Sequence, residues 1–347
     1  MTPLLAWSQD DFLAQRSGYH VLADYLDAPR VVTHRGDPSG GASLLVTRLL
    51  RRFSLSRWYT GGSAKMEREV WARCRAGFSG PVHLLWCDRD IGFLDVLLTH
   101  SQNPLIGTFH HPPEQLDQIF RHKKRLHRLR AFILMSETQK EWFLSQGIPG
   151  ERLHVILHGV DTEYFKPIER TESSAKTQFL SVGQTGRDFG MLKQLASHFE
   201  GHPTIRFRII GPEHEAARFG HLNGVQFETR ISDEALLRAY QNADALLHLT
   251  KSATANNVLV EALACGTPVI ANRVGGVPEY LNESCAILGP AGGENLIRDA
   301  IIRFSADLSL QRSMRNAARS HAETLSWTHV AARTRAIQES CVSCLQA

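Results

Sequence analysis

The segment ADALLHLTKSATANNVLVEALACGTPVIA, residues 243–271, alternates two apolar runs with one amphipathic stretch. The runs 243–249 and 268–271 are short and aliphatic, which is typical of buried strands. Between them, apolar residues from Val258 to Leu263 recur at helical spacing and predict a helix that begins near Asn257. A strand, a crossover helix and a second strand form the repeating unit of a parallel sheet.

The same alternation extends in both directions along the chain. In the second half we expect further strands at 179–182, 205–210, 225–227 and 285–288. In the first half we expect strands at 30–34, 82–86, 104–109, 131–135 and 153–156, and helices at 17–26, 40–53 and 114–130.

A polar stretch after Pro167 breaks this rhythm and marks a linker. We therefore predict an α/β protein with two Rossmann-like, doubly wound domains, 1–165 and 166–324. Sheets of this kind bind ligands at the carboxyl ends of their strands, so we expect the site in an interdomain cleft.

The composition bounds the function classes. The chain has 347 residues, which is enough for two domains. Its composition, with 43% apolar and 21% charged residues, excludes a disordered or fibrous protein. Lys and Arg exceed Asp and Glu by 39 to 35, an excess too small to indicate nucleic acid. No apolar run is long enough for a membrane span, and the start lacks the basic region of a signal peptide. We therefore expect a cytoplasmic protein.

Neither the cysteines nor the histidines form a metal-ligand pattern. The six cysteines are scattered, and the one C-x-x-C, Cys341 and Cys344, has no second ligand pair nearby. The 17 histidines include no H-E-x-x-H helix. We expect reduced thiols and no bound metal.

The helix that begins near Asn257 is a candidate phosphate site. Free backbone N–H groups and the positive end of the helix dipole would suit a diphosphate there, through the amides of Asn257, Val258 and Leu259. Glu261 lies one turn further on, where a carboxylate can bind a ribose diol. The alternative for Glu261 is a solvated surface carboxylate.

The loop SVGQTGRDFG, residues 181–190, follows a predicted strand. Gly183 and Gly186 allow a tight turn, and Arg187 stands at the start of the next helix. A guanidinium there can bind diphosphate oxygens bidentately; the alternative is a salt-bridged helix cap. The pattern is not G-x-G-x-x-G, which disfavours a nicotinamide-dependent oxidoreductase.

In the first half, GTFHHPPEQL, residues 107–116, places His110 and His111 directly after a predicted strand. A neutral imidazole can accept or relay a proton near pH 7, and His110 is the first choice. A structural histidine is the alternative.

Three stretches together resemble the family-four glycosyltransferases, retaining enzymes of the GT-B fold. They are NNVLVEALACGTPVIANRVGGVPEYL (256–281), SETQKEWFLSQGIPGERLHVILHGVDTEYFKP (136–167) and LSWTHVAARTRAIQES (325–340). The resemblance implies that Glu261 binds the ribose and that a helix within 325–347 crosses back onto the first domain. It also implies that His110 touches the donor sugar or the acceptor hydroxyl. A glycine loop near the diphosphate is implied at Gly18, with Ser39, Gly40 and Gly41 as a rival.

The chain departs from the family at three positions. A second Glu, eight residues before the ribose-binding one, is replaced by Ala253. Lys251 and Asn256 are candidates for polar contacts to the donor sugar in its place, and the favoured alternative for each is a solvated loop residue. The diphosphate-binding Arg and Lys are replaced by Gln184 and Phe189, although some branches resemble the G-x-x-x-R-D form seen here around Arg187.

We therefore predict a retaining, metal-independent, hexosyltransferase-type glycosyltransferase. It would transfer a sugar from a nucleoside diphosphate sugar, UDP or GDP being favoured, to a hydroxyl of a glycan, lipid-linked or small-molecule acceptor, without a further cofactor. The alternative is a catalytically silent GT-B module that binds nucleotide.

Two basic stretches are candidates for contact with the inner face of a membrane. Residues 48–58 mix arginines with Phe53 and Trp58, and residues 116–130 carry basic residues beside an apolar stripe. The same stripe could instead pack against the sheet. Nucleic acid is not expected as a partner.

Overall fold

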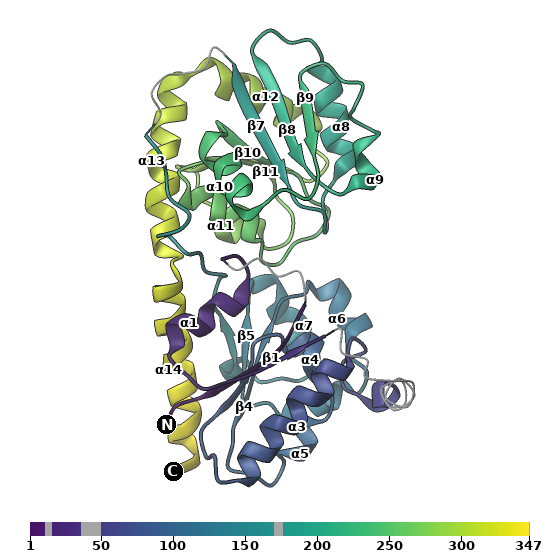
Figure 1. Cartoon of the computed structure of the whole chain (residues 1–347), viewed down its shortest axis with the longest axis vertical. Coiled ribbons are helices and arrows are strands. Elements are labelled where there is room, and N and C mark those ends of the chain that lie inside the picture. The colour runs from purple at the N-terminus through teal and green to yellow at the C-terminus, as the bar shows by residue number, and fades with distance from the viewer. Residues whose placement is uncertain (11–15, 36–49, 170–175, 347) are drawn as a thin grey trace. The chain divides into compact units, whose positions relative to one another are not determined.

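A computed structural model of the chain describes residues 1–10, 16–35, 50–169 and 176–346, with side chains up to Val342. It divides into two compact units (Figure 1). The N-terminal unit comprises Met1–Leu157 together with Thr328–Ala347, and the C-terminal unit is His158–Trp327. Residues 11–15, 36–49, 170–175 and 347 lie outside the description, and with them the rival glycine loop at Ser39, Gly40 and Gly41.

The N-terminal unit is built on a six-stranded parallel sheet with the order β2-β1-β3-β4-β5-β6. Its strands are β1 (Leu4–Gln9), β2 (Arg30–His34), β3 (Val82–Leu84), β4 (Leu105–Phe109), β5 (Ala131–Leu134) and β6 (Leu153–Val155). Its helices are η1 (Tyr19–Val21), α1 (Leu22–Leu26), α3 (Gly61–Arg75), α4 (Cys87–Asp90), α5 (Leu94–Leu97), α6 (Pro113–Ile119), η2 (Lys123–Arg128), η3 (Glu137–Gln139), α7 (Lys140–Ser145), η4 (Gly150–Arg152) and α14 (Trp327–Gln346).

Local signals explain how several of these elements begin. The Thr60 hydroxyl accepts from the backbone N–H of Ser63 and starts α3 with a capping box. Pro113 occupies the first turn of α6, where its missing N–H is not needed. Strand β4 is buried along its whole length, as expected for a strand inside a parallel sheet.

One strand of this unit was missed, and one expected helix was wrong. Strand β1 was not predicted, because its apolar run LLAW gives way at once to polar residues. The single helix expected over 114–130 is two elements, α6 and η2. They are separated at Phe120, whose backbone pairs with that of Ser56 in an antiparallel bridge. Of the helix expected over 40–53, only a helical turn at 50–53 lies within the described residues.

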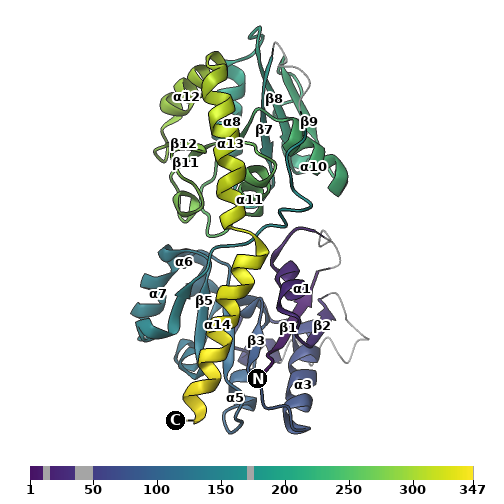
Figure 2. The same cartoon turned by 90° about the vertical axis from the view of Figure 1, so that its left-hand side faces the viewer.

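Helix α14 runs along the N-terminal unit, as Figure 2 shows. The amide of Gln338 donates to Nδ1 of the buried His83 on β3 at 3.0 Å, and Nε2 of His83 lies 2.8 Å from the hydroxyl of Thr108 on β4. The last helix of the chain is therefore bonded to the centre of the first sheet.

The C-terminal unit has a second six-stranded parallel sheet, with the order β12-β11-β10-β7-β8-β9. Its strands are β7 (Thr177–Val182), β8 (Ile205–Ile210), β9 (Val225–Glu228), β10 (Ala245–His248), β11 (Val269–Asn272) and β12 (Ala286–Gly289). Its helices are α8 (Phe189–His198), α9 (Glu213–Ala216), α10 (Asp233–Asn242), α11 (Asn257–Ala264), η5 (Val277–Tyr280), α12 (Glu294–Ala306) and α13 (Leu308–Thr324). All six strands match the predicted runs.

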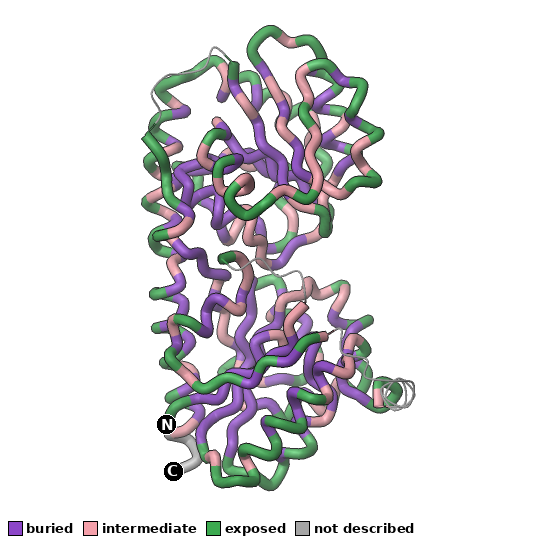
Figure 3. Tube along the Cα trace, viewed as in Figure 1, coloured by how far each residue is buried: buried purple, intermediate pink, exposed green. Residues whose placement is uncertain are grey.

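Apolar side chains from β7, β8, β10, α8 and α12 form the core of this unit. Phe179, Leu247 and Ile301 are among its fully buried members. Figure 3 shows the buried strands lying inside each unit and the exposed residues following the outer faces of the helices. The two doubly wound sheets confirm the predicted α/β class.

No helix within the described part of the chain is both long and apolar enough to cross a membrane.

Candidate functional site

In the C-terminal unit, the predicted site residues gather where β7 and β10 end and α11 begins. Asn256 caps α11, and its Oδ1 accepts from the N–H of Val258 at 3.1 Å. The N–H of Leu259 donates to the backbone oxygen of Asn256. The amides of Val258 and Leu259, expected to be open to a phosphate, are therefore already bonded to the cap residue.

Arg187 is held directly against this cap. Its Nε donates to the carbonyl oxygen of Val182 at 2.7 Å, and its Nη2 donates to Oδ1 of Asn256 at 3.2 Å. Its Nη1 is buried and has no hydrogen-bond partner among the described residues. Burial lowers the pKa of Arg187 to about 10. The structure thus brings Arg187 and Asn256 together and leaves one guanidinium nitrogen unused.

Glycine is required where this loop turns. Gly183 has a φ of 107°, and a Cβ atom there would lie 2.8 Å from Nη2 of Arg187. Gly186 has a φ of 70°, and a Cβ there would lie 2.7 Å from the backbone oxygen of Ser252. The two glycines let the loop bring Arg187 to the first turn of α11.

Glu261 lies on α11 and is 3% exposed, so it is not the solvated surface carboxylate of the alternative reading. The hydroxyl of Tyr240, on α10, donates to its Oε2 at 3.0 Å. Burial, and then the charge of Glu261, hold the pKa of Tyr240 well above its usual range. Tyr240 therefore stays protonated and acts as a hydrogen-bond donor to the carboxylate.

Two of the three replaced family positions have structural roles. Phe189 packs in the core of the unit, and Ala253 is buried with its carbonyl accepting from the N–H of Gly276 at 3.0 Å. Gln184 is exposed. Lys251 is also exposed, and its Nζ lies 3.9 Å from Oδ1 of Asp188 rather than on the cap of α11.

In the N-terminal unit, His110 and His111 follow β4 and are both tied to Asp88, which is completely buried on α4. Oδ2 of Asp88 accepts from the backbone N–H of His110 at 2.7 Å and of His111 at 3.0 Å. The same oxygen lies 2.5 Å from Nδ1 of His111, whose side chain is 26% exposed. This pairing leaves Nε2 as the ring nitrogen of His111 directed away from Asp88.

His110 is directed inward instead. Its Nε2 lies 2.7 Å from the carbonyl oxygen of Leu85 and therefore carries the proton. Burial lowers the pKa of His110 to about 4, so the ring is neutral at pH 7. The ring stacks on Trp86 at 5.6 Å, and Tyr19 meets it edge-on at 4.8 Å.

The glycine loop candidate lies beside these rings. Gly18 has a φ of 105° and directly precedes Tyr19. Its backbone conformation, which favours glycine, sets the entry to η1. The structure therefore brings Gly18, His110 and His111 to the same end of the N-terminal sheet.

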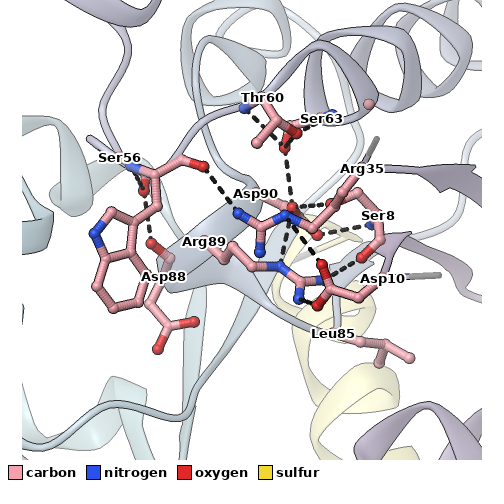
Figure 4. A network of polar contacts seen from close by, with 12 residues as sticks. Ser8, Asp10, Arg35, Ser56, Thr60, Ser63, Leu85, Asp88, Arg89 and Asp90 are labelled. Atoms are coloured by element: carbon pink, nitrogen blue, oxygen red, sulfur yellow. Dashed lines mark hydrogen bonds and ion pairs between the residues drawn. The ribbon is translucent and has the colours of Figure 1, made fainter. Parts of the chain in front are cut away.

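Sequence reasoning missed a network of charges at this end of the sheet (Figure 4). Asp90 is completely buried and accepts from the backbone N–H of Ser8 at 2.8 Å and from the hydroxyl of Ser63 at 3.0 Å. Arg89 pairs with Asp10 at 2.9 Å, and Arg35 lies 3.5 Å from the other oxygen of Asp10. The signal was WCDRD, residues 86–90, a cluster of charges directly after a predicted strand.

Within the described part of the chain, His, Cys, Asp and Glu side chains form no group of three or more that could hold a metal ion. The five cysteines whose side chains are described are free thiols.

Each half of the chain matches the sequence model of a known protein family. The sequence model of the family described as "Glycosyl transferases group 1" matches residues 165–321, and that of "Glycosyltransferase Family 4" matches residues 28–164. A curated relative is the MMP alpha-(1->4)-mannosyltransferase of Mycolicibacterium hassiacum, 23% identical over 78% of this chain and 74% of its own length.

Solved structures share the fold. Sucrose-phosphate synthase from Thermosynechococcus elongatus superposes with a TM-score of 0.73 at 17% identity, covering 99% of this chain and 100% of its own. Anabaena Alr3699/HepE, solved in complex with UDP-glucose, gives a TM-score of 0.71 at 15% identity, covering 99% and 100%. Two adjacent family matches and two doubly wound sheets agree: the chain belongs to the family-four, group 1 glycosyltransferases and has their GT-B fold.

Proposed function

We propose that this glycosyltransferase transfers a sugar, with retention of configuration, from a nucleoside diphosphate sugar to an acceptor hydroxyl. The observation that carries the proposal is the meeting of Arg187, Asn256 and the cap of α11, one helical turn from the buried Glu261. Alr3699/HepE, which shares the fold, was solved with UDP-glucose, and this supports UDP as the first nucleotide to test.

In this proposal the carboxylate of Glu261 accepts hydrogen bonds from the ribose hydroxyls. The hydroxyl of Tyr240 donates to Oε2 of the same carboxylate and holds it in place. Arg187 binds the diphosphate through Nη1, the nitrogen that has no partner among the described residues. A guanidinium in a buried setting stabilises the charge that grows on the departing diphosphate, and this electrostatic effect commonly dominates such transfers. The fixed positive charge of Arg187 supports a reaction that does not need a metal ion.

The acceptor, a glycan, a lipid-linked sugar or a small molecule, would bind at the carboxyl end of the N-terminal sheet. His110 is neutral there and stacked on Trp86, and the half-buried His111 is anchored by Asp88. Either ring can hydrogen-bond a sugar hydroxyl. The departing diphosphate would take the proton of the acceptor hydroxyl, so that catalysis rests on positioning and charge stabilisation.

The rival is a module that binds nucleotide and transfers nothing. It is motivated by Ala253, Gln184 and Phe189, none of which offers the charged side chain usual in the family.

The first test is a thermal-shift screen of UDP, GDP and ADP with EDTA present. A nucleotide that binds only the folded chain raises its Tm. Glu261→Ala and Arg187→Ala should each abolish most of the shift, whereas the exposed Glu234→Ala and Arg312→Ala should keep it. An unchanged shift in both site variants would refute the placement of the donor.

The second test follows the sugar released from UDP-glucose by proton NMR before mutarotation. Retention predicts that α-glucose appears first. Appearance of β-glucose would contradict retention, and tight binding of UDP-glucose with no turnover across a panel of acceptors would favour the silent module.

A further inference from the structure

The two basic stretches of the N-terminal unit lie against one another. Ser56 and Phe120 form an antiparallel bridge. The N–H of Arg57 donates to the oxygen of Ile119 at 2.8 Å, and the N–H of Arg121 donates to the oxygen of Leu55 at 3.0 Å. These bonds join residues 51–57 and 121–128 into one surface, which we call the joined basic surface.

Most of the cations of this surface are exposed and unpaired with a carboxylate. The side chains of five of its residues are exposed and form no ion pair with any described carboxylate: Arg51, Arg52, Arg57, Arg121 and Lys124. The nearby carboxylates are engaged elsewhere, since Asp95 pairs with Arg125 and Arg128, and Asp117 pairs with Lys123. Five cations that pair with no described carboxylate therefore lie within residues 51–57 and 121–128, although the chain as a whole carries only +4.

The backbone under these cations is held from inside the unit. Arg125 is anchored on Asp95 and donates through Nη1 to the carbonyl oxygen of Phe53 at 3.2 Å. Nε of Arg51 donates to the carbonyl oxygen of Arg57 at 2.7 Å, which closes the loop between them. The two backbone segments that carry these cations are therefore held together.

One large apolar side chain stands among the arginines. Phe53 is 54% exposed. The apolar stripe of the second stretch is not available, because Leu116, Leu126 and Leu129 are buried in the core of the unit. Exposed cations on two joined segments, with one exposed ring among them in the sequence, match a negatively charged bilayer, whose headgroups attract the cations and whose interface accepts the ring.

We infer that the joined basic surface docks the enzyme on a membrane rich in anionic lipids, with Phe53 entering the headgroup region. Each basic residue near such a surface strengthens binding by about fivefold. Nucleic acid fits less well, because single strands are bound on rows of aromatic side chains and Phe53 is the one exposed aromatic ring between residues 51 and 57. The inference goes beyond the proposed function, since it requires neither donor nor acceptor.

The experiment is co-sedimentation of the full chain with vesicles of phosphatidylcholine alone and of an equal mixture with phosphatidylglycerol. We expect binding to the mixed vesicles only, weakened by salt. The triple variant R52E/R57E/R121E should lose at least about a hundredfold in affinity, because three attractive charges are removed and three repulsive ones are added. A matched triple variant with reversals at other exposed arginines, R68E/R303E/R312E, should bind like the unaltered chain. Phe53→Ser should weaken binding about tenfold and leave the salt dependence unchanged.

Three outcomes would overturn the inference: equal binding to both vesicles, equal loss in the two triple variants, or displacement from mixed vesicles by a single-stranded oligonucleotide. The UDP-induced rise in Tm, measured on each variant, reports folding and the donor site separately. If UDP does not raise the Tm of the unaltered chain, the proposed function fails and the membrane result stands. If the unaltered chain does not bind mixed vesicles, the membrane inference fails and the proposed function stands.

Discussion

The carboxylate of Asp88 lies 2.5 Å from Nδ1 of His111 and is completely buried, while the imidazole is about a quarter exposed. One carboxylate oxygen thus receives the ring and two backbone N–H groups. Burial alone would raise the pKa of Asp88, but His111 and these donors hold it well below its usual range. The stability from this pair is therefore complete above about pH 4 and is lost as the pH falls further.

Asp88→Asn should lower the free energy of unfolding at pH 7 by about 2–3 kcal/mol, because hydrogen bonds to a charged group are weakened. The penalty should shrink toward pH 3, where the carboxyl group of the unfolded chain is protonated. Urea titrations at both pH values measure it. The exposed Asp117→Asn should cost under about 1 kcal/mol. An Asp88 penalty that does not vary with pH would contradict the charged pairing.

His83 makes the unfolding free energy depend on pH in a second way. Burial lowers the pKa of His83 to about 3, so the neutral ring contributes stability that is complete above about pH 6.5 and is lost as the pH falls toward 3. His83→Gln can keep both hydrogen bonds and should remove up to about 3 kcal/mol of the fall between pH 6.5 and pH 4. Thermal melts across this range measure the slope. The exposed His100→Gln serves as control, and an equal flattening there would refute the assignment.

Tyr240→Phe removes the donor to Glu261 and keeps the ring. We expect a loss of about 1 kcal/mol in the free energy of unfolding. If Glu261 binds the ribose, calorimetric titration should also show weaker UDP binding by several-fold, because the carboxylate is then less firmly oriented. If Tyr240→Phe loses stability but binds UDP normally, the result would contradict ribose binding by Glu261.

His248→Leu should stabilise the protein. Both ring nitrogens of His248 are buried without a hydrogen-bond partner among the described residues, and burial holds its pKa well below the usual range. Replacing an unsatisfied polar ring by an apolar side chain should add about 1 kcal/mol to the free energy of unfolding. Chemical denaturation gives the difference. If His248→Leu instead lowers the free energy of unfolding and His248→Gln does not, the ring has a polar partner.

Much of the fold is legible in the sequence because parallel strands are buried on both faces. The central strands β10 and β11 of the C-terminal unit, buried at every residue, appear as short apolar runs. Strands β8 and β9 are interrupted by Arg206, Arg208 and Gln226, but their apolar residues still mark them as strands. Strand β1 escaped prediction because only four of its residues are apolar and a polar stretch follows. The break at Phe120 escaped because it depends on backbone bonds to residues 55–57, more than sixty positions earlier.

The sequence predicted the site residues that lie at the carboxyl ends of strands. It did not predict the side chains that hold those residues in place. The rule that ligands lie at the carboxyl ends of strands pointed to Arg187, Glu261 and His110. The residues that hold them are remote in sequence: Asp88 is 23 positions from His111, and Tyr240 is 21 positions from Glu261. Side-chain pairing of this kind follows from packing, which no local pattern encodes. The functional roles themselves stay predictions.

The hydrogen bond between Gln338 and His83 bears on the order in which the two units fold during synthesis. Residues 158–327 form their unit from one continuous stretch and can fold once they have left the ribosome. The first 157 residues cannot complete theirs, because the helix that bonds to the middle of their sheet is made last. A chain that ends at residue 327 and has been released from the ribosome should therefore contain a protease-resistant segment 158–327 and a first half that is still cleavable.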